Sequence, residues 1–354
     1  MKVLNHYIAT EILKSALIAL VLLLALVIFI TFTDELGDLG KGDYGLQQVF
    51  QYLLLITPRM LFELMPSAAL LGSLMALGAI SNNHEIVAMR AAGVSLFQII
   101  GAVMRAGLIL AVITALVGEF VAPVAEKSAQ ILKTTAQKKQ IALQTKYGFW
   151  LRDGNSYINI REIHQGNELK EIYLYELNEN HRLQVASHAD RANYQDGRWQ
   201  LNGLSQSEFS DEQVTAKSLP ETEWSSLLDP DILNILSVKP DNLSLTGLAK
   251  YAQFLEENGQ DSRAFELAFW RRLFSPLSTL MMLLIAVPFV LGFKRVSSTG
   301  QRVLVGILIG IGFSLFDRTF GHLGLVYNLS PLFAAGFPLL LFLVPALVAI
   351  KRLK

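Results

Sequence analysis

Four charged side chains stand in stretches that are otherwise apolar enough to lie in a lipid bilayer. Arg59 and Glu63 are four residues apart, about one helical turn, so they could form an ion pair. Asp317 and Arg318 are adjacent and therefore point to different sides of a helix. Charge inside a membrane is costly and marks either a polar cavity or a bridge between helices. The sequence leaves both open for Arg59 and Glu63, whereas Asp317 and Arg318 each need a partner on another segment.

The spacings that enzyme chemistry requires are missing. The absence of cysteine excludes thiolate catalysis, Cys-ligated metal and disulfides. The six histidines show no metal-ligand spacing, and neither a G-x-S-x-G nor an H-E-x-x-H motif occurs. Asp317 and His322 are five residues apart, which is poor spacing for an acid–base pair on one helical face. We therefore predict no catalytic residue, no metal site and no cofactor.

The elements that position the intramembrane charges must be membrane helices. Hydrophobic residues make up 52% of the chain and charged residues 17%, against about 25% charged in a soluble domain. A helix needs ~20 apolar residues to cross a hydrocarbon core of ~30 Å. Stretches of that kind lie near residues 12–33, 51–80, 98–121, 272–293, 303–325 and 331–350. We predict an α-helical membrane protein with six transmembrane helices, three before and three after a polar segment, and a first helix that is retained rather than cleaved.

Charge in the short loops predicts how the helices are oriented. Lys and Arg gather at the termini and in the loops after the second and fourth spans, whereas the loop after the first span holds four acids and Lys41. Because short cytoplasmic loops retain Lys and Arg, we expect cytoplasmic termini and a middle segment outside the cell membrane, which is the periplasm if the cell has two membranes. The net charge is zero and no basic stripe occurs, which excludes nucleic acid as a partner.

The polar middle segment has the pattern of β-strands. Apolar and polar residues alternate, as in 157–160 and 171–175, and turn signals recur at 153–155, 165–167, 178–180 and 196–197. Short alternating runs with frequent turns are typical of a sandwich or jelly roll, and Asp196-Gly197 marks the clearest hairpin. Ser244 and Gly259 bound a helix that follows. The predicted domains are transmembrane helices 1–3 at 1–122, an all-β sandwich or jelly roll with flanking helices at 123–270, and transmembrane helices 4–6 at 271–354.

A short helix is predicted between the second and third spans, over residues 82–93. Asn82 or Asn83 could cap it, Glu85 would lie in its first turn, and Gly93 would end it. It is too short to cross a bilayer, and its apolar residues cover more than one face, which is typical of a partner site. A helix lying among lipid headgroups is the alternative. Such helices are richer in Lys and Arg, and an acid gains nothing against an anionic leaflet, so the pattern favours a partner.

Two stripes of small residues indicate close helix packing. Ala68, Gly72 and Ala76 recur every four residues in the second span, and Gly306, Gly310 and Ser314 do so in the fifth. Small residues let helix backbones approach where lipid provides no hydrophobic drive. We interpret both stripes as structural.

Three functional classes fit six spans with an outer domain. The first is an energised exporter, which would need a separate motor because Gly40-Lys41-Gly42 lacks the rest of a phosphate-binding loop. The second is a membrane-embedded enzyme, for which no convincing nucleophile or acid–base pair is present. The third is a proton-coupled lipid transporter that uses Asp317 and acts without an ATPase, although no internal repeat supports it.

Three stretches of the sequence together resemble the lipopolysaccharide-export permeases of the LptF/LptG family, and LptG more than LptF. They are Glu85–Gly93, Gly118–Pro123 and Gly148–Gly154, and the resemblance extends over essentially the whole chain. It implies an inner-membrane permease of an ABC transporter that extracts lipopolysaccharide from the outer leaflet for delivery to the outer membrane. It also implies an LptF-type permease, an LptB-type ATPase dimer that uses the ATP, an LptC-type single-span protein and an LptA-type periplasmic bridge as partners.

The resemblance also implies roles for particular residues. In that family the short cytoplasmic helix seats in the ATPase, which makes Glu85 the coupling carboxylate, with His84, Ile86, Met89 and Arg90 around it. LptG proteins commonly carry basic residues on and just after the first span, but residues 29–38 contain none here. By position, Arg59, Lys133 and Arg318 could contact the lipid phosphates instead, with Phe32 beside them.

Overall fold

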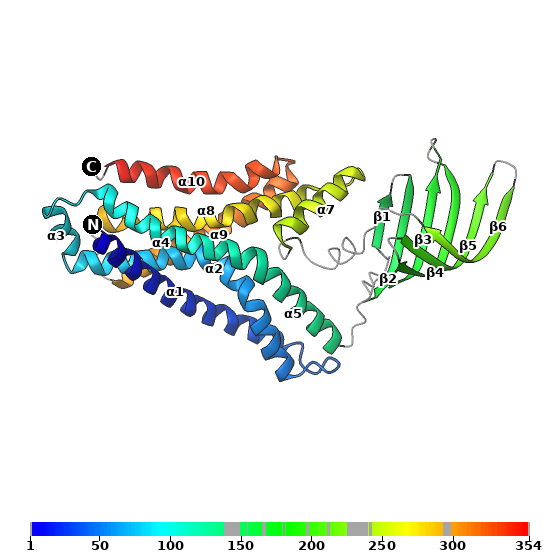
Figure 1. Cartoon of the computed structure of the whole chain (residues 1–354), viewed down its shortest axis with the longest axis horizontal. Helices are drawn as coiled ribbons and strands as arrows, with labels where there is room; N and C mark the ends of the chain where they lie inside the picture. Colours follow the sequence, from blue (N-terminus) through cyan, green and yellow to red (C-terminus); the bar gives the residue numbers. More distant parts are fainter. Residues whose placement is uncertain are drawn as a thin grey trace.

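The computed structural model describes residues 2–137, 149–153, 155–164, 168–178, 180, 182–195, 198–210, 213–224, 240, 243–292 and 299–352. In Figure 1 a long helical bundle carries a β-sheet at one end, and both termini lie at the opposite end, near the short helix α3. The helices are α1 (Lys2–Leu36), α2 (Leu46–Asn82), α3 (Glu85–Ala91), α4 (Leu96–Leu116), the π-helix η1 (Val117–Val121), α5 (Ala122–Ala136), α7 (Leu245–Glu257), α8 (Arg263–Gly292), α9 (Thr299–Val326) and α10 (Pro331–Arg352).

Six helical segments are long and apolar enough to cross a membrane, which confirms the predicted three-plus-three arrangement. The third is composite, because α4, η1 and α5 run on without a break from Leu96 to Ala136. Helix α2 lies at the centre of the bundle, where 67% of its most apolar window is buried, against 17% for α1 and for α9. The outer faces of α1 and α9 are therefore left exposed by this chain.

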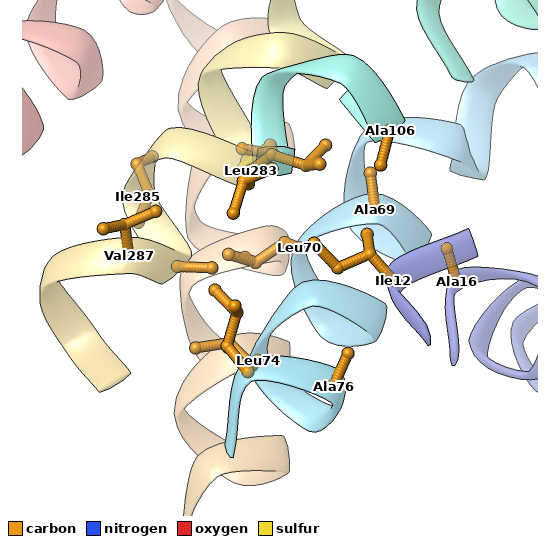
Figure 2. Close-up of a cluster of buried hydrophobic side chains, with 14 of the residues drawn as sticks. Ile12, Ala16, Ala69, Leu70, Leu74, Ala76, Ala106, Leu283, Ile285 and Val287 are labelled. Atoms are coloured by element: carbon orange, nitrogen blue, oxygen red, sulfur yellow. The ribbon is translucent and has the colours of Figure 1, made fainter. Parts of the chain in front are cut away.

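The bundle core lies where α1, α2, α4 and α8 meet. Figure 2 shows Leu70 of α2 between Ile12 of α1 and Leu283 of α8, with Leu74 one turn further along α2. All four side chains are essentially buried. Small residues bring the helices close: a Cβ on Gly72 would lie 2.3 Å from Ala16 Cα. A Cβ on Gly306 of α9 would likewise lie 2.7 Å from Leu74. Both stripes of small residues thus serve helix packing, as predicted.

The middle segment forms an antiparallel sheet of six strands in chain order, β1 to β6. They are β1 (Phe149–Asp153), β2 (Ser156–His164), β3 (Glu168–Leu177), β4 (Leu183–Gln195), β5 (Arg198–Phe209) and β6 (Val214–Trp224). The pairs Tyr194–Trp199 and Gln195–Arg198 flank the predicted hairpin turn, whose residues 196 and 197 lie outside the described residues. The all-β insert is confirmed. The finer jelly-roll topology is not, because the described strands form one sheet with consecutive neighbours.

Helix α7 links the sheet to the membrane bundle. Ser244 caps it by accepting a hydrogen bond from the Gly247 amide at 3.1 Å, and Gly259 follows it with φ +64°, both as predicted. Tyr251, Phe254 and Leu255 of α7 belong to the same apolar cluster as the buried face of the sheet. Burial raises the pKa of Tyr251 to about 12. The sheet is thus anchored through α7 to the start of α8.

Candidate functional site

A cavity of about 640 Å³ opens in the half of the bundle nearer the sheet. Residues of α2, α5, α8, α9 and α10 line it, and they include four arginines and three acids: Arg59, Arg271, Arg272, Arg318, Glu63, Glu126 and Asp317. Two of the predicted substrate contacts, Arg59 and Arg318, lie in its wall. The other two, Lys133 and Phe32, lie outside it. The structure therefore separates the predicted contacts into two places.

The charged residues of the cavity form a network of ion pairs. Arg59 Nε lies 3.8 Å from Glu63 Oε1 on the same helix and 3.5 Å from Glu126 Oε2 on α5. The other oxygen of Glu63 lies 3.5 Å from Arg318 Nη2 on α9. Asp317 pairs with Arg271 of α8 at 3.2 Å. Arg59 and Glu63 therefore form an ion pair and also line a polar cavity, so both interpretations from the sequence hold. Asp317 and Arg318 have partners on other helices, as the sequence required.

The Gly118–Pro123 stretch is the site of the π-helix η1. An i→i+5 turn leaves a carbonyl without its usual partner, and the Gly118 carbonyl accepts a hydrogen bond from Arg272 Nη2 instead. Glycine is required there, because a Cβ would lie 2.5 Å from the Phe62 ring, over which the Arg272 guanidinium sits at 5.2 Å. Glu119 Oε2 accepts a hydrogen bond from the Leu245 amide at the start of α7 at 2.9 Å. This motif joins three elements around the cavity.

Arg271 and Arg272 are cavity residues that the sequence reasoning missed. They lie at the predicted start of the fourth span. A charged residue there is easily interpreted as marking the point where the helix leaves the membrane. The signal in the sequence was the doublet itself, followed directly by an apolar run. Two adjacent arginines on one helix point to different partners, and here one reaches α9 while the other reaches η1.

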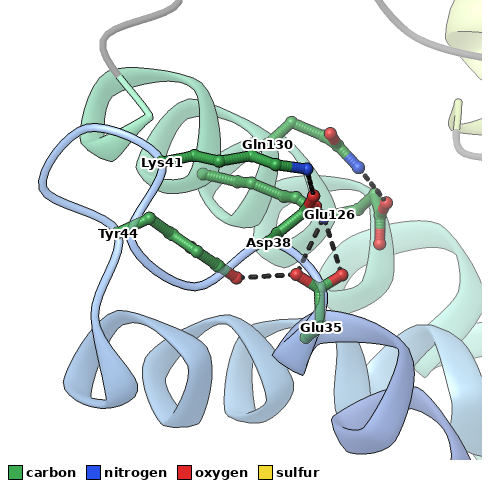
Figure 3. Close-up of polar contacts among 7 residues, drawn as sticks. Glu35, Asp38, Lys41, Tyr44, Glu126 and Gln130 are labelled. Atoms are coloured by element: carbon green, nitrogen blue, oxygen red, sulfur yellow. Dashed lines mark hydrogen bonds and ion pairs between the residues drawn. The ribbon is translucent and has the colours of Figure 1, made fainter.

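Lys133 takes part in a second, tighter charge cluster at the far end of α1. Its Nζ lies 2.7 and 2.8 Å from the two oxygens of Glu35 and 2.9 Å from Asp38 Oδ2. Figure 3 shows Tyr44 directed at Glu35, and this hydroxyl donates to Glu35 Oε2 at 2.9 Å. Hydrogen bonds from Lys41 and Lys133 hold the pKa of the Asp38 carboxyl well below its usual range. We call Glu35, Asp38, Tyr44 and Lys133 the α1–α5 brace.

Phe32 lies near this brace, on the first span. Its ring stacks on Phe50 of α2 with a centroid distance of 5.7 Å, and it packs against the apolar cluster around Tyr52 and Met60. It belongs to the packing of α1 on α2 rather than to the cavity wall. Glu35 and Asp38, two acids of residues 29–38, bind Lys133 at this end of α1.

The short helix forms where it was predicted, but its N-terminus differs. Neither Asn82 nor Asn83 caps it: the N-cap is His84, with φ +56° and no side-chain cap, because α2 itself extends to Asn82. Ile86 is buried and Met89 packs on the bundle core, so less apolar surface is exposed than predicted, with Val87 as its main part. The Glu85 carboxylate accepts hydrogen bonds from Tyr7 Oη at 3.0 Å and from Asn83 Nδ2 at 3.2 Å, and Arg90 is exposed.

The sheet brings together one further group that the sequence reasoning did not foresee. Ligand atoms of Glu171, His188 and Asp190 lie within 4.8 Å of one another on strands β3 and β4. The alternation of β4 places His188 and Asp190 on one face, but Glu171 comes from another strand, so no local spacing reveals the group. His188 Nε2 lies 3.0 Å from Glu171 Oε2, and the His188 ring packs on Tyr173 at 4.6 Å. These contacts account for the group as an exposed polar network.

Known proteins of one family match this chain along nearly its whole length. The family model for the lipopolysaccharide export system permease LptF/LptG matches residues 6–352. The lipopolysaccharide export system permease protein LptG of Haemophilus influenzae is 36% identical over 344 residues, which cover 96% of this chain and 96% of that protein. The protein of that name from Escherichia coli K12 is 34% identical over 353 residues, 99% of this chain and 98% of its own length. The chain belongs to the LptF/LptG family of lipopolysaccharide export permeases.

Proposed function

We propose that this chain is the LptG-type half of a lipopolysaccharide exporter and withdraws the lipid from the outer leaflet of the inner membrane. The observation that carries the proposal is an arginine-lined cavity inside a six-helix bundle whose family exports an anionic lipid. Lipid A carries phosphates and several acyl chains, and each CH₂ exposed to water costs ~0.8 kcal/mol. A carrier therefore needs both cations for the headgroup and a sheltered apolar path for the chains.

The chain is a multi-pass inner-membrane protein, and we propose its orientation from charge. The termini and α3 lie together at one end of the bundle in Figure 1. Among the described residues, Lys14, Arg90, Lys351 and Arg352 are exposed toward that end, whereas Lys41 is in the loop at the other end and pairs with Asp38. The positive-inside rule then places this end in the cytoplasm and the sheet in the periplasm. The cavity, which lies toward the sheet, would open at the level of the outer leaflet.

We propose that the headgroup phosphates meet Arg59 and Arg318. Both guanidiniums line the cavity, and a guanidinium matches the oxygens of a phosphate with two parallel donors. Lys133 has a different part in this proposal, because its cation is shared between Glu35 and Asp38. It holds α1 against α5, and Phe32 packs nearby on α2, so both would shape the entrance rather than bind phosphate.

The acyl chains would lie along the exposed apolar faces of α1 and α9. Leu22, Leu26 and Phe29 of α1 and Leu308, Ile311 and Leu315 of α9 are exposed in this chain. A second, LptF-type permease facing them would close a shared cavity, since large apolar surfaces of this kind mark association sites. The periplasmic sheet would then pass the lipid toward an LptC-type protein and an LptA-type bridge.

We propose that the energy comes from an LptB-type ATPase dimer docked on α3. His84, Val87 and Arg90 are exposed there, while Ile86 and Met89 fix the helix to the bundle core. A rigid attachment would transmit movement of α3 to α2 and α4. Glu85→Ala removes the carboxylate that would engage the motor, so we expect lipid-stimulated ATPase activity to fall at least about tenfold. The isolated membrane domain should keep its melting temperature.

Copurification after mild solubilisation tests the proposal as a whole. We expect the chain to bring down a second six-span protein and an ATPase, and the reconstituted complex to move lipopolysaccharide only with ATP. Glu11→Gln is a suitable control for Glu85→Ala. It also removes one acid, but this acid pairs with Lys14 and lies away from the cavity. Transport or turnover by the purified chain alone would instead favour a proton-coupled transporter or a membrane-embedded enzyme.

A further inference from the structure

The cavity network contains a carboxylate in the position where a phosphate would bind. Glu63 projects one oxygen toward Arg59 Nε at 3.8 Å and the other toward Arg318 Nη2 at 3.5 Å. It thereby connects α2 to α9 through two different guanidiniums. A bound phosphate would present its oxygens to the same two groups.

The neighbouring arginines have partners that are either closer or more deeply buried. Arg271 pairs with Asp317 at 3.2 Å, and Arg272, which is 9% exposed, donates to the Gly118 carbonyl. Arg59 also has Glu126, which is 2% exposed, at 3.5 Å. Arg318 by contrast is 70% exposed and pairs with Glu63, itself 41% exposed. The Glu63–Arg318 contact is thus the part of the network that an incoming anion can most readily displace, because exposed ion pairs are weak.

We propose that Glu63 is an internal counter-ion that selects lipids with phosphomonoester groups over ordinary phosphodiester phospholipids. An anion that enters must replace a carboxylate of charge −1 between two arginines. A phosphodiester carries the same single charge, so the exchange brings no electrostatic gain. A phosphomonoester carries about −1.5 to −2 at neutral pH and gains more attraction from both arginines than the carboxylate loses.

This selection matters because of what surrounds the protein. If the proposed function holds, the cavity opens to a bilayer whose anionic phospholipids are phosphodiesters and outnumber the substrate. Without Glu63, Arg59 would keep Glu126 but Arg318 would lose the carboxylate that pairs with it, and those lipids could occupy its place. The Glu63 carboxylate competes with both kinds of lipid, and it lowers the affinity for the singly charged phosphodiester more than that for the phosphomonoester. Specificity then arises as a difference between two affinities. The inference therefore rests on the proposed function and adds the substrate's phosphate class to it.

The test uses the complete complex, copurified with its own partner subunits and placed in nanodiscs. Fluorescent lipid A is the probe, and the bilayer is either phosphatidylcholine alone or contains phosphatidylglycerol as a competitor. For the wild type we expect phosphatidylglycerol to change the apparent Kd less than about twofold. In Glu63→Gln we expect tighter binding in phosphatidylcholine and a loss of affinity of about fivefold when phosphatidylglycerol is added, the size expected of a partly exposed charge pair.

Further variants separate the role of Glu63 from a general loss of structure. Glu63→Asp keeps the charge and should keep the discrimination. Arg318→Gln should weaken lipid A binding, and adding Glu63→Gln to it should then bring much less gain, because the two residues act on one site. Glu11→Gln, which alters an exposed pair far from the cavity, should behave as the wild type. The melting temperature of each complex reports whether it has folded.

The outcomes distinguish the two proposals. Wild-type complex that binds no lipid A saturably contradicts the proposed function and this inference with it. Wild-type complex that binds lipid A while Glu63→Gln shows unchanged competition by phosphatidylglycerol, or weaker binding in phosphatidylcholine, overturns only the role of Glu63. An equal gain from Glu63→Gln with and without Arg318 would also overturn it.

Discussion

The two charge clusters of the membrane bundle differ in how firmly their cations are held. In the α1–α5 brace, Lys133 Nζ is 2.7–2.9 Å from its carboxylate partners, and Glu35 is 7% exposed and receives the Tyr44 hydroxyl as well. In the cavity, Glu63 is 3.5–3.8 Å from its arginines and is far more exposed. Short, buried and multiply bonded pairs fix structure, whereas long, exposed pairs can exchange partners. Only the second cluster is suited to receive a ligand.

The largest expected effect comes from breaking the brace. Lys133→Ala leaves the buried Glu35 carboxylate without its cation, so we expect a loss of about 2–3 kcal/mol in stability. Thermal unfolding in nanodiscs measures it. The double variant Lys133→Met/Glu35→Gln should recover part of the loss, because no uncompensated charge remains. A loss below about 0.5 kcal/mol for Lys133→Ala would mean that the brace is no firmer than the cavity pairs.

Breaking the Glu63–Arg318 pair in the cavity should affect lipid binding more than stability. Arg318→Gln removes an exposed partner, so we expect a stability change within about 0.5 kcal/mol. Binding of lipopolysaccharide should nevertheless weaken about fivefold or more, because a charge-assisted contact to phosphate is lost. Photocrosslinking and equilibrium binding measure this. A strong destabilisation with unchanged binding would show that the Glu63–Arg318 pair stabilises the fold and does not bind the lipid.

Salt should separate the clusters further. Exposed pairs are screened at an ionic strength of about 1 M, where the Debye length is ~3 Å, while buried pairs are screened much less. Spin labels on the α2 and α9 backbones beside the Glu63–Arg318 pair should show a wider distance distribution in high salt, and labels on α1 and α5 beside the brace should not. Equal broadening at both places would contradict the comparison.

The smallest effect concerns pH and Asp38. Its pKa is held well below the usual value by Lys41 and Lys133, so its contribution is fully present above the unfolded value of about 3.9 and is lost as pH falls through the lower, folded value. Asp38→Asn should therefore lower the melting temperature slightly at pH 7 and down to about pH 4. The difference from wild type should shrink below that. A difference that already disappears near pH 6 would show that Asp38 is not held in this way.

Much of the fold was predictable because its signals are local. Six apolar runs predict six spans, since no other backbone arrangement of that length satisfies its hydrogen bonds in lipid. Ser244 and Gly259 predict the ends of α7, and alternation with Asp196-Gly197 predicts the strands on either side of the hairpin. The N-cap of α3 was wrong because the asparagines were taken into the end of α2, and helix boundaries depend on which helix extends further.

The candidate site was predictable only in part. The cost of charge in a membrane marks Arg59, Glu63, Asp317 and Arg318 from sequence alone, because each must be satisfied inside the protein. Sequence could not place Lys133 with Glu35, which lies 98 residues away, and so could not tell a brace from a lipid contact. The doublet Arg271-Arg272 was visible in the sequence, but the partner of Arg271 was not, because it comes from another helix.

What the sequence determined by itself is the set of segments that must cross the membrane and the set of charges that must find partners there, because hydrophobicity and desolvation act on each residue wherever it lies. What the tertiary structure decided is which partner each charge has. Ion pairs depend on distances of a few ångströms between helices, and those distances follow from packing at Gly72, Gly118 and Gly306 rather than from the charged residues themselves. The separation of a firm brace from a loosely paired cavity exists only once the helices have met.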